Sequence, residues 1–295
     1  MTVSNKPIFI PEGCVAALGT FDGVHEGHRQ VLAAAGQAGF PVVVVTSAQN
    51  PQSVLGRQVK HRIFSSDRCD ALFESLGVAA VIRFNFADIQ PLSPTEYLDG
   101  LVTGMNAKGF ACGFNFRFGK GAAGNADTLR DYGEKRGLSV FVTDPVLIGG
   151  EPVSSTRIRN AIAQGDMPLA EQLLGSPYRL DEPVIHGDAR GRTLGFPTAN
   201  QAFVNDAVLP KFGVYATRVT VDGITYAAVT NVGIRPTYRS PVVLAESYLV
   251  DYAGDLYGKR ISVEFKLFLR PERRFASPEE LIEQMTQDLN RAKTI

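Results

Sequence analysis

Short apolar runs and helical segments alternate through the first half of the chain. The apolar runs have the length and composition of buried strands, and they lie at 14–19, 41–46, 79–84, 110–113 and 138–143. Helices are expected between them, at about 27–38, at 65–76, from a capping box at 93–96, and at 125–136. Because strands that alternate with helices form parallel sheets, this half predicts an α/β domain whose ligands bind at the carboxyl ends of the strands.

The pattern changes near residue 180, where a helix closes with Gly175 and Pro177. Short strands are then expected at 183–186, 213–221, 224–231, 242–249 and 261–269. Such strands, two of them joined by a tight Asp222-Gly223 turn, favour a small antiparallel β-barrel. A capping box at 277–280 opens a last helix, and an apolar stripe is expected to pack it on the barrel: Leu281, Met285 and Leu289. The sequence therefore predicts two domains, 1–180 and 181–295.

Composition narrows the classes of partner. The 295 residues include 30 basic and 30 acidic side chains, so the formal net charge is zero and no nucleic-acid partner is indicated. The three cysteines are far apart and form no C-x-x-C pair, which favours a reducing cytoplasm. No signal core and no run as long as the ~18 residues of a membrane span is evident. We expect a folded cytoplasmic protein with small ligands and no membrane partner, and no pattern indicates its oligomeric state.

The first candidate site lies between the first strand and its helix, in the segment from Gly19 to His28. A strand, a glycine turn and a helix start aim free N–H groups and the positive end of the helix dipole at one point, which favours an anion. His25 and His28 are three residues apart at the helix entrance, so both imidazoles can face that anion. A zinc site is the alternative, although no third Cys, His or carboxylate partner is obvious.

The second candidate site is the segment from Gly191 to Asn200. Pro197 disfavours a helix, and Thr198 and Asn200, two residues apart, then point to the same side. A hydroxyl and an amide oxygen placed in this way suit one hard cation, while glycines and arginines beside them suit a phosphate. The alternative is a turn that enters an edge strand.

Two more stretches combine loop chemistry with charge. The segment 113–125 joins glycines, one arginine and three aromatic residues, which suits a flavin or adenine ring with its phosphate; the alternative is a core strand and a polar loop. The hydroxyls of 154–156 can cap a helix or bind phosphate through the same free N–H groups. Arg159 would add a charge-assisted contact to a leaving pyrophosphate.

These motifs resemble a known family. The string G-R-T-L-G-F-P-T-A-N at 191–200 resembles the riboflavin kinase signature, and G-T-F-D-G-V-H-E-G-H at 19–28 resembles the nucleotidyltransferase signature of bacterial FAD synthetases. Segments at 113–119, 154–159, 231–238, 246–252, 255–258 and 269–275 also resemble family segments. The resemblance implies a bifunctional riboflavin kinase and FMN adenylyltransferase, with a Rossmann-like nucleotidyltransferase domain followed by a riboflavin kinase barrel.

For the first domain, the resemblance implies that the FMN phosphate attacks the α-phosphate of ATP while His25, His28 and Arg159 neutralise charge. The residues expected to bind ATP or phosphate in the two domains are Gly19, Phe21, Asp22, Gly23, Ser154, Ser155, Thr156, Gly191, Arg192 and Gly195. The residues expected to bind flavin are Asn115, Arg117, Phe118, Asn231 and Arg235.

For the second domain, the resemblance implies that Thr198 and Asn200 hold Mg²⁺ with ATP. It also implies that Glu246 is the general base for the 5′-hydroxyl of riboflavin, although Tyr248 replaces the family's histidine two residues later. On position alone, a carboxylate in a strand is more often a solvated outer-face residue.

One segment departs from the family pattern. Where the family has T-F-x-P-H-P, this chain has T-S-A-Q-N-P at 46–51, so the aromatic residue and the histidine are absent. An alternative is therefore a riboflavin kinase whose first domain is impaired in adenylylation. A second alternative, from another class, is a regulator that binds flavin or nucleotide without catalysis.

Overall fold

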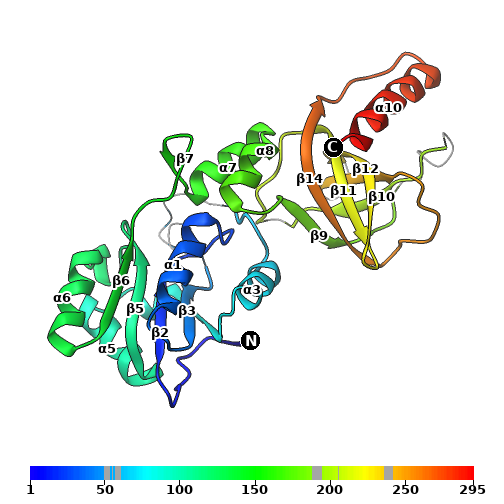
Figure 1. The fold of residues 1–295 in the computed structure, drawn as a ribbon. Helices are drawn as coiled ribbons and strands as arrows, with labels where there is room; N and C mark the ends of the chain where they lie inside the picture. The colour runs from blue at the N-terminus through cyan, green and yellow to red at the C-terminus, as the bar shows by residue number, and fades with distance from the viewer. Residues whose placement is uncertain (50–53, 55, 57–60, 188–194, 205, 236–241) are drawn as a thin grey trace. The chain divides into compact units, whose positions relative to one another are not determined.

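The computed structural model describes residues 1–49, 54, 56, 61–187, 195–204, 206–235 and 242–295. The chain divides into two compact units, Met1–Ser155 and Thr156–Ile295 (Figure 1). The predicted domains, 1–180 and 181–295, stay a prediction about which segments fold independently. Among the described residues, no helix is both long enough and apolar enough to cross a membrane.

The first unit is built on a parallel sheet, which confirms the predicted α/β domain. Its described strands follow the order β1, β4, β3, β2, β5, β6, and every neighbouring pair is parallel. The strands are β1 (Thr2–Ser4), β2 (Cys14–Leu18), β3 (Val42–Ser47), β4 (Ala80–Phe84), β5 (Ala107–Gly113) and β6 (Ser139–Thr143). The direction of winding reverses between β2 and β5, and such a switch point is where open α/β sheets bind ligands.

Helices connect these strands. They are α1 (Glu26–Gly36), α3 (Ser66–Ser75), α4 (Phe86–Ile89), α5 (Pro94–Met105), the short 3₁₀ helix η1 (Lys120–Ala122) and α6 (Ala126–Arg136). The predicted capping box at the start of α5 is confirmed, because Ser93 and Glu96 each accept the backbone N–H of the other. A two-stranded ladder, β7 (Leu147–Ile148) with β8 (Glu151–Pro152), follows β6.

Apolar side chains cover both faces of the sheet. Cys14, Ala16 and Leu18 of β2 belong to a core cluster that also holds buried residues of α5 and α6. Val15 and Ala17 point to the opposite face and are also fully buried, and α1 packs against β2 and β5 (Figure 1). Burial on both faces explains why these strands are continuous apolar runs in the sequence.

The second unit begins with two helices, α7 (Ser155–Gln164) and α8 (Met167–Leu174). The first residue of α7, Ser155, is the last residue of the first unit. An antiparallel sheet follows in the order β10, β13, β12, β11, β14, β9. Its strands are β9 (Arg179–Pro183), β10 (Ala199–Ala202), β11 (Gly213–Val221), β12 (Ile224–Arg235), β13 (Val242–Leu249) and β14 (Arg260–Arg270). The two end strands, β9 and β10, come together, so the sheet curls into a nearly closed barrel.

The strand expected at 183–186 is wrong in position. The strand β9 lies at Arg179–Pro183, where it pairs with β14, and Ile185 forms only an isolated bridge to Asn200. The short strand β10 pairs on one side with β13, so the motif does enter an edge strand. The role of this segment in binding a cation and phosphate stays a prediction.

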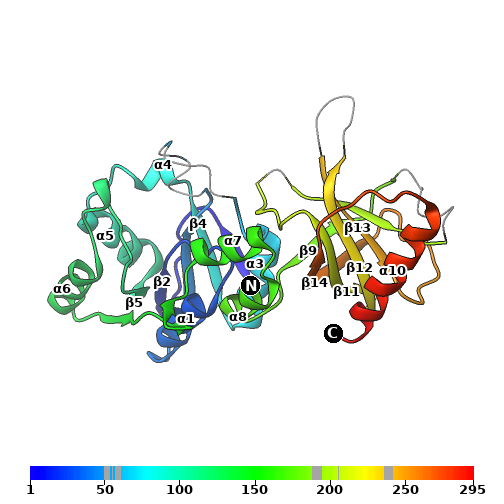
Figure 2. The same cartoon turned by 90° about the horizontal axis from the view of Figure 1, so that it is seen from above.

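The C-terminal helix α10 (Pro278–Lys293) packs on the outer face of β11 and β12, as predicted (Figure 2). Leu289 of the predicted stripe packs in the apolar cluster between this helix and the sheet. The most buried side chains of the helix, however, are Asp288 and Ala292. Asp288 is buried and paired with Arg270 of β14, whose Nε donates to its carboxylate at 2.9 Å and whose Nη2 lies 2.8 Å from the same oxygen. A charged pair thus anchors the helix beside its apolar contacts.

Candidate functional site

The loop after β2 holds two ordinary residues in a backbone conformation that favours glycine. Phe21 has φ 49° and Val24 has φ 44°, on either side of Gly23 at φ 84°. Such strain costs on the order of 1–3 kcal/mol per residue and persists only where the surroundings impose it. The buried ring of Phe21 is held edge-on against Phe73, with ring centroids 5.8 Å apart, and it contacts His28 at 5.0 Å. The turn is therefore fixed by packing.

The two histidines of this loop form a stacked pair at the start of α1. Their ring centroids are 3.6 Å apart with an interplanar angle of 14°. His25 is the N-cap of α1, and its Nδ1 accepts the backbone N–H of His28 at 3.3 Å. Because Nδ1 accepts a hydrogen bond, the neutral His25 ring carries its proton on Nε2. The structure therefore brings together the two predicted catalytic imidazoles.

The His28 residue is half-buried, whereas His25 is buried. The Nδ1 of His28 is buried and has no hydrogen-bond partner among the described residues. Burial, and to a smaller extent the neighbouring His25, lowers the pKa of His28 well below its ordinary value of 6.5. Among the described residues, no group of three or more His, Cys, Asp or Glu side chains is placed to hold a metal ion.

Asp22 joins this turn to a second predicted phosphate-binding stretch. Its carboxylate accepts the backbone N–H of Ile63 at 3.0 Å, and its carbonyl accepts the hydroxyl of Ser155 at 3.1 Å. Ser155, at the first position of α7, is therefore adjacent to the turn that carries the histidines. Ser154 precedes it and is half-buried. Thr156 and Arg159 follow on α7 and belong to the second unit, Thr156 exposed and Arg159 half-buried.

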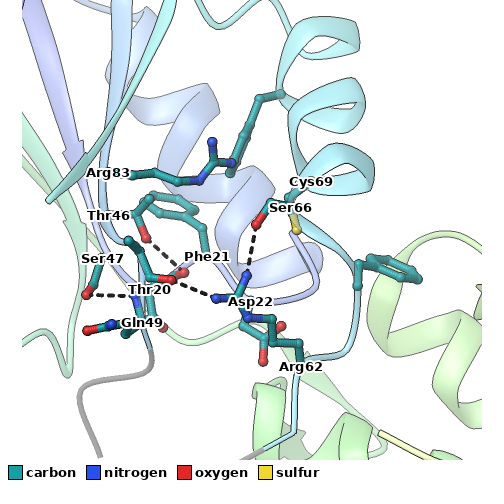
Figure 3. A pocket seen from close by; sticks show the side chains of 13 residues that line it. Thr20, Phe21, Asp22, Thr46, Ser47, Gln49, Arg62, Ser66, Cys69 and Arg83 are labelled. Carbon is teal, nitrogen blue, oxygen red and sulfur yellow. Dashed lines mark hydrogen bonds between the residues drawn. The ribbon is translucent and has the colours of Figure 1, made fainter. Parts of the chain in front are cut away.

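A pocket opens at the carboxyl ends of β2, β3 and β4 (Figure 3). Its lining includes Thr46, Ser47, Ala48 and Gln49, the described part of the segment that departs from the family pattern. Arg62 ties this segment to α3: it donates to the carbonyl of Ala48 at 2.7 Å and to the hydroxyl of Ser66 at 2.8 Å. These contacts join Ala48 to α3 without the family's aromatic residue.

Sequence reasoning missed the arginines of this pocket. Arg62 precedes α3, and Arg83 near the end of β4 binds the carboxylate of Asp70 with both arms. The signal that could have found Arg83 is its place at the carboxyl end of a predicted strand, where ligands of parallel sheets bind. Arg62 has no comparable signal, because no strand predicted from the sequence ends next to it.

The loop after β5 separates its predicted flavin-binding residues. Asn115 and Arg117 are exposed, whereas Phe118 is buried in the core of the first unit. The Phe118 ring stacks on Phe116, with centroids 5.6 Å apart, and its backbone pairs with Gly124 through two hydrogen bonds. A side chain at position 124 would come within 2.8 Å of that ring. Phe118 therefore anchors the loop to the core of the unit, and its role in flavin binding stays a prediction.

In the second unit, three predicted site residues lie in one row across neighbouring strands. Glu246 of β13 pairs in register with Asn200 of β10 on one side and with Asn231 of β12 on the other. Side chains of directly opposed residues point to the same face, with Cβ atoms about 4.5–5.5 Å apart. The barrel interior lies on the opposite face, because Ser247, next to Glu246, is fully buried there with Thr230.

The amide of Asn200 is held close to Thr198. Its Nδ2 donates to the carbonyl of Thr198 at 3.3 Å, and the Asn200 side chain is only 5% exposed. Gly187 leaves room for this amide, since a Cβ at that position would lie 2.5 Å from Nδ2. A hydroxyl and an amide oxygen supply the hard oxygen ligands that Mg²⁺ prefers, and Mg²⁺ usually takes few protein ligands beside substrate phosphates. Thr198 and Asn200 therefore fit that ion.

The remaining predicted residues of the second unit differ in their contacts and exposure. Asn231 donates to the carboxylate of Glu272 at 2.9 Å, while its Oδ1 is buried without a partner among the described residues. Arg235, at the end of β12, is half-buried, and Gly195 is exposed at φ 83°. Gly191 and Arg192 lie outside the described residues.

Comparisons with known proteins cover both units. A family model described as FAD synthetase matches residues 8–157, and one described as riboflavin kinase matches residues 174–295. The chain is 35% identical over 283 residues to the bifunctional riboflavin kinase/FMN adenylyltransferase of Listeria monocytogenes, covering 93% of this chain and 90% of that protein. It is 37% identical over 291 residues to the protein of the same description from Bacillus subtilis, covering 94% and 91%.

One solved structure shares the fold over the whole chain. It is described as a macrolide-efflux protein from Streptococcus pneumoniae, and it matches with a TM-score of 0.91 and 29% identity over 100% of both chains.

The histidine pair gives a test of its own. Because the folded-state pKa of His28 lies below 6.5, the unfolded chain binds this proton more readily than the folded chain does. Its contribution to the free energy of unfolding is therefore present above that value and is lost as the pH falls below it. We expect His28→Gln to reduce the loss of stability between about pH 7 and about pH 5.

NMR titration of the imidazoles measures the same pKa directly. We expect His28 to titrate well below 6.5 in the folded protein. In His25→Gln the smaller cause is removed, so the pKa of His28 should rise yet stay below its ordinary value. A His28 ring that titrates at or above 6.5 would contradict the burial of its Nδ1.

Proposed function

Because the chain belongs to the family of bifunctional riboflavin kinase/FMN adenylyltransferases, we propose that it makes FAD from riboflavin at two separate sites. The second unit would phosphorylate riboflavin to FMN with ATP, and the first would transfer AMP from a second ATP to FMN. The observation that supports the proposal is the row of Asn200, Glu246 and Asn231, in which one carboxylate lies opposite two asparagines on one barrel face.

In the kinase step, Glu246 would accept the proton of the riboflavin 5′-hydroxyl as that oxygen bonds to the γ-phosphorus of ATP. The bond from this phosphorus to the β-γ bridging oxygen breaks, and ADP leaves. Thr198 and Asn200 would hold Mg²⁺, which when bound neutralises charge on the ATP phosphates. Asn231 and Arg235 would orient the flavin and the nucleotide. Positioning and charge stabilisation supply most of the catalysis of phosphoryl transfer, so no covalent intermediate with the protein is required.

In the adenylyl step, an FMN phosphate oxygen would attack the α-phosphorus of ATP, and pyrophosphate would leave. The start of α1 and the N–H groups of the turn with Phe21, Asp22 and Gly23 favour the phosphates electrostatically. His25 and His28 would donate hydrogen bonds to the phosphate oxygens, on which negative charge develops during the reaction. Arg159 and the hydroxyls at 154–156 would bind the leaving group, and the segment 115–118 would contact the flavin.

A second candidate is a riboflavin kinase with impaired adenylylation. The observation that favours it is the pocket wall of Ser47, Ala48 and Gln49, which differs from the family's F-x-P. The histidine pair and the contact between Asp22 and Ser155 support an active first unit instead, because both remain assembled. A regulator without catalysis is the least supported reading, since the chain's relatives are described as enzymes and Glu246 lies opposite Asn200.

Buried free thiols suit a reducing compartment. Cys14, Cys69 and Cys112 are all free and buried, and burial raises the pKa of each thiol. We propose the cytoplasm as the setting, where ATP and flavins are the small-molecule partners.

Glu246→Gln tests the kinase site. Removing the base should lower the rate of FMN formation by at least about a hundredfold, because a positioned general base contributes that much or more. Formation of FAD from supplied FMN should stay within twofold of the parent protein. Glu264→Gln is the matched control, since it neutralises another half-buried strand carboxylate of the same barrel. Equal losses of both activities in Glu246→Gln would refute the assignment of separate sites.

His28→Ala tests the adenylyl site. Loss of a donor to the developing charge should lower FAD formation from FMN by about 10²- to 10³-fold and leave FMN formation unchanged. Gln30→Ala, an exposed change on the same helix, serves as the control. An FAD rate in His28→Ala equal to that of the parent would remove His28 from the mechanism.

A further inference from the structure

The barrel has a seam between its two end strands. β10 and β9 stand at opposite ends of the strand order, so closing the barrel requires contacts between them. Among the described residues, one backbone hydrogen bond is seen to cross from the end of β9 to β10, from the N–H of Ile185 to the carbonyl of Asn200 at 2.8 Å. β10 is also the shortest strand of this sheet, with four residues. Backbone pairing alone therefore gives this strand little support on its open side.

The side chain of Gln201 closes the seam from inside the barrel. It is fully buried, and its Nε2 donates to the carbonyl of Glu182 in β9 at 2.6 Å and to the carbonyl of Ile261 in β14 at 3.0 Å. One amide thus ties β10 to both strands on the far side of the seam. Glu182 and Ile261 are themselves register partners, so the two acceptors lie side by side.

The carbonyl oxygen of the Gln201 amide makes no such contact within the described part of the chain. The Oε1 of Gln201 is buried and has no hydrogen-bond partner among the described residues. Burying an unpaired acceptor is unfavourable, and an apolar side chain of the same length would fill the space without that cost. The two donor bonds across the seam therefore explain a glutamine at this position.

We propose that Gln201 is a positioning residue for the kinase site. Asn200 is its chain neighbour, and the same strand sets Asn200 opposite Glu246. By holding β10 to β9 and β14, Gln201 keeps the amide of Asn200 at its place beside Thr198. Gln201 points into the barrel and Asn200 to the outer face, so Gln201 acts through the backbone of β10 without touching substrate. The inference rests on the proposed role of Asn200 and Thr198 in holding Mg²⁺.

The barrel interior supplies a matched control. Thr217 is also buried and polar, and its hydroxyl bonds to the carbonyl of Ala228 at 3.2 Å and to the hydroxyl of Thr230 at 2.8 Å. These contacts join β11 to β12, on the side of the barrel away from the seam. Thr217→Val should therefore weaken the barrel without loosening β10.

The first experiment measures amide hydrogen exchange on the full chain without ligands. Gln201→Met removes the donor and keeps the side-chain length, while Gln201→Asn keeps the amide but is one methylene too short to reach. We expect exchange in the β10 peptide to rise at least tenfold in either variant, with β11 at most twofold faster. In Thr217→Val we expect exchange to rise at least tenfold in β11 and at most twofold in β10. Unchanged protection of β10 in both Gln201 variants, or an equal rise in β10 and β11 in both, would overturn the proposal.

The second experiment titrates Mg²⁺ against FMN formation at saturating riboflavin and ATP. Loss of positioning should raise the Mg²⁺ concentration for half-maximal rate at least fivefold in Gln201→Met and Gln201→Asn, whereas a merely destabilised barrel in Thr217→Val lowers only the maximal rate. The rate of FAD formation from FMN is measured in each variant as a control, because it shows that the rest of the chain is intact. Asn200→Ala is run in parallel. If it shifts the half-maximal concentration and neither Gln201 variant does, the proposal is wrong; if Asn200→Ala has no effect, the proposed Mg²⁺ site itself is wrong.

Discussion

The register of β13 between β10 and β12 decides what the second unit can do. Glu246 faces Asn200 on one strand and Asn231 on the other only in this pairing. A slip by one residue would turn Glu246 into the barrel and bring Ser247, now bonded to Thr230 in the interior, to the outer face. The buried hydroxyls therefore protect the register from inside, because a slipped strand would bury a carboxylate among them. The proposed site on the outer face therefore depends on packing on the inner face.

The first unit uses the same principle with a different geometry. The direction of winding reverses between β2 and β5, and the strained turn with Phe21 and Val24 directly follows β2. Packing of the Phe21 ring against Phe73 and His28 fixes this turn in advance. In its proposed role as a phosphate-binding turn, a segment fixed by packing costs less free energy to order when a nucleotide binds.

The sequence predicts those parts whose cause is local. The strands β2 to β6 are mostly apolar runs, and the capping box at Ser93 is a short pattern, so both are found correctly. The polar, exposed strand β1 gives no such signal and is not predicted. β9 is misplaced because its residues, 179–183, are mostly charged and have no apolar alternation; only pairing with β14 makes them a strand. The same limit applies to the site. The motifs give Glu246, Asn200 and the histidines, but Arg62, Gln201 and the buried place of Phe118 depend on contacts between distant segments.

The central claim is that both units are active enzymes in one chain. The measurement that tests it most directly is a chromatographic time course of the purified protein with riboflavin, ATP and Mg²⁺, in which FMN and FAD are followed separately. The account predicts that FMN appears first and that FAD then forms at its expense. Accumulation of FMN without FAD would contradict it, and would mean that the altered segment after β3 has cost the first unit its chemistry.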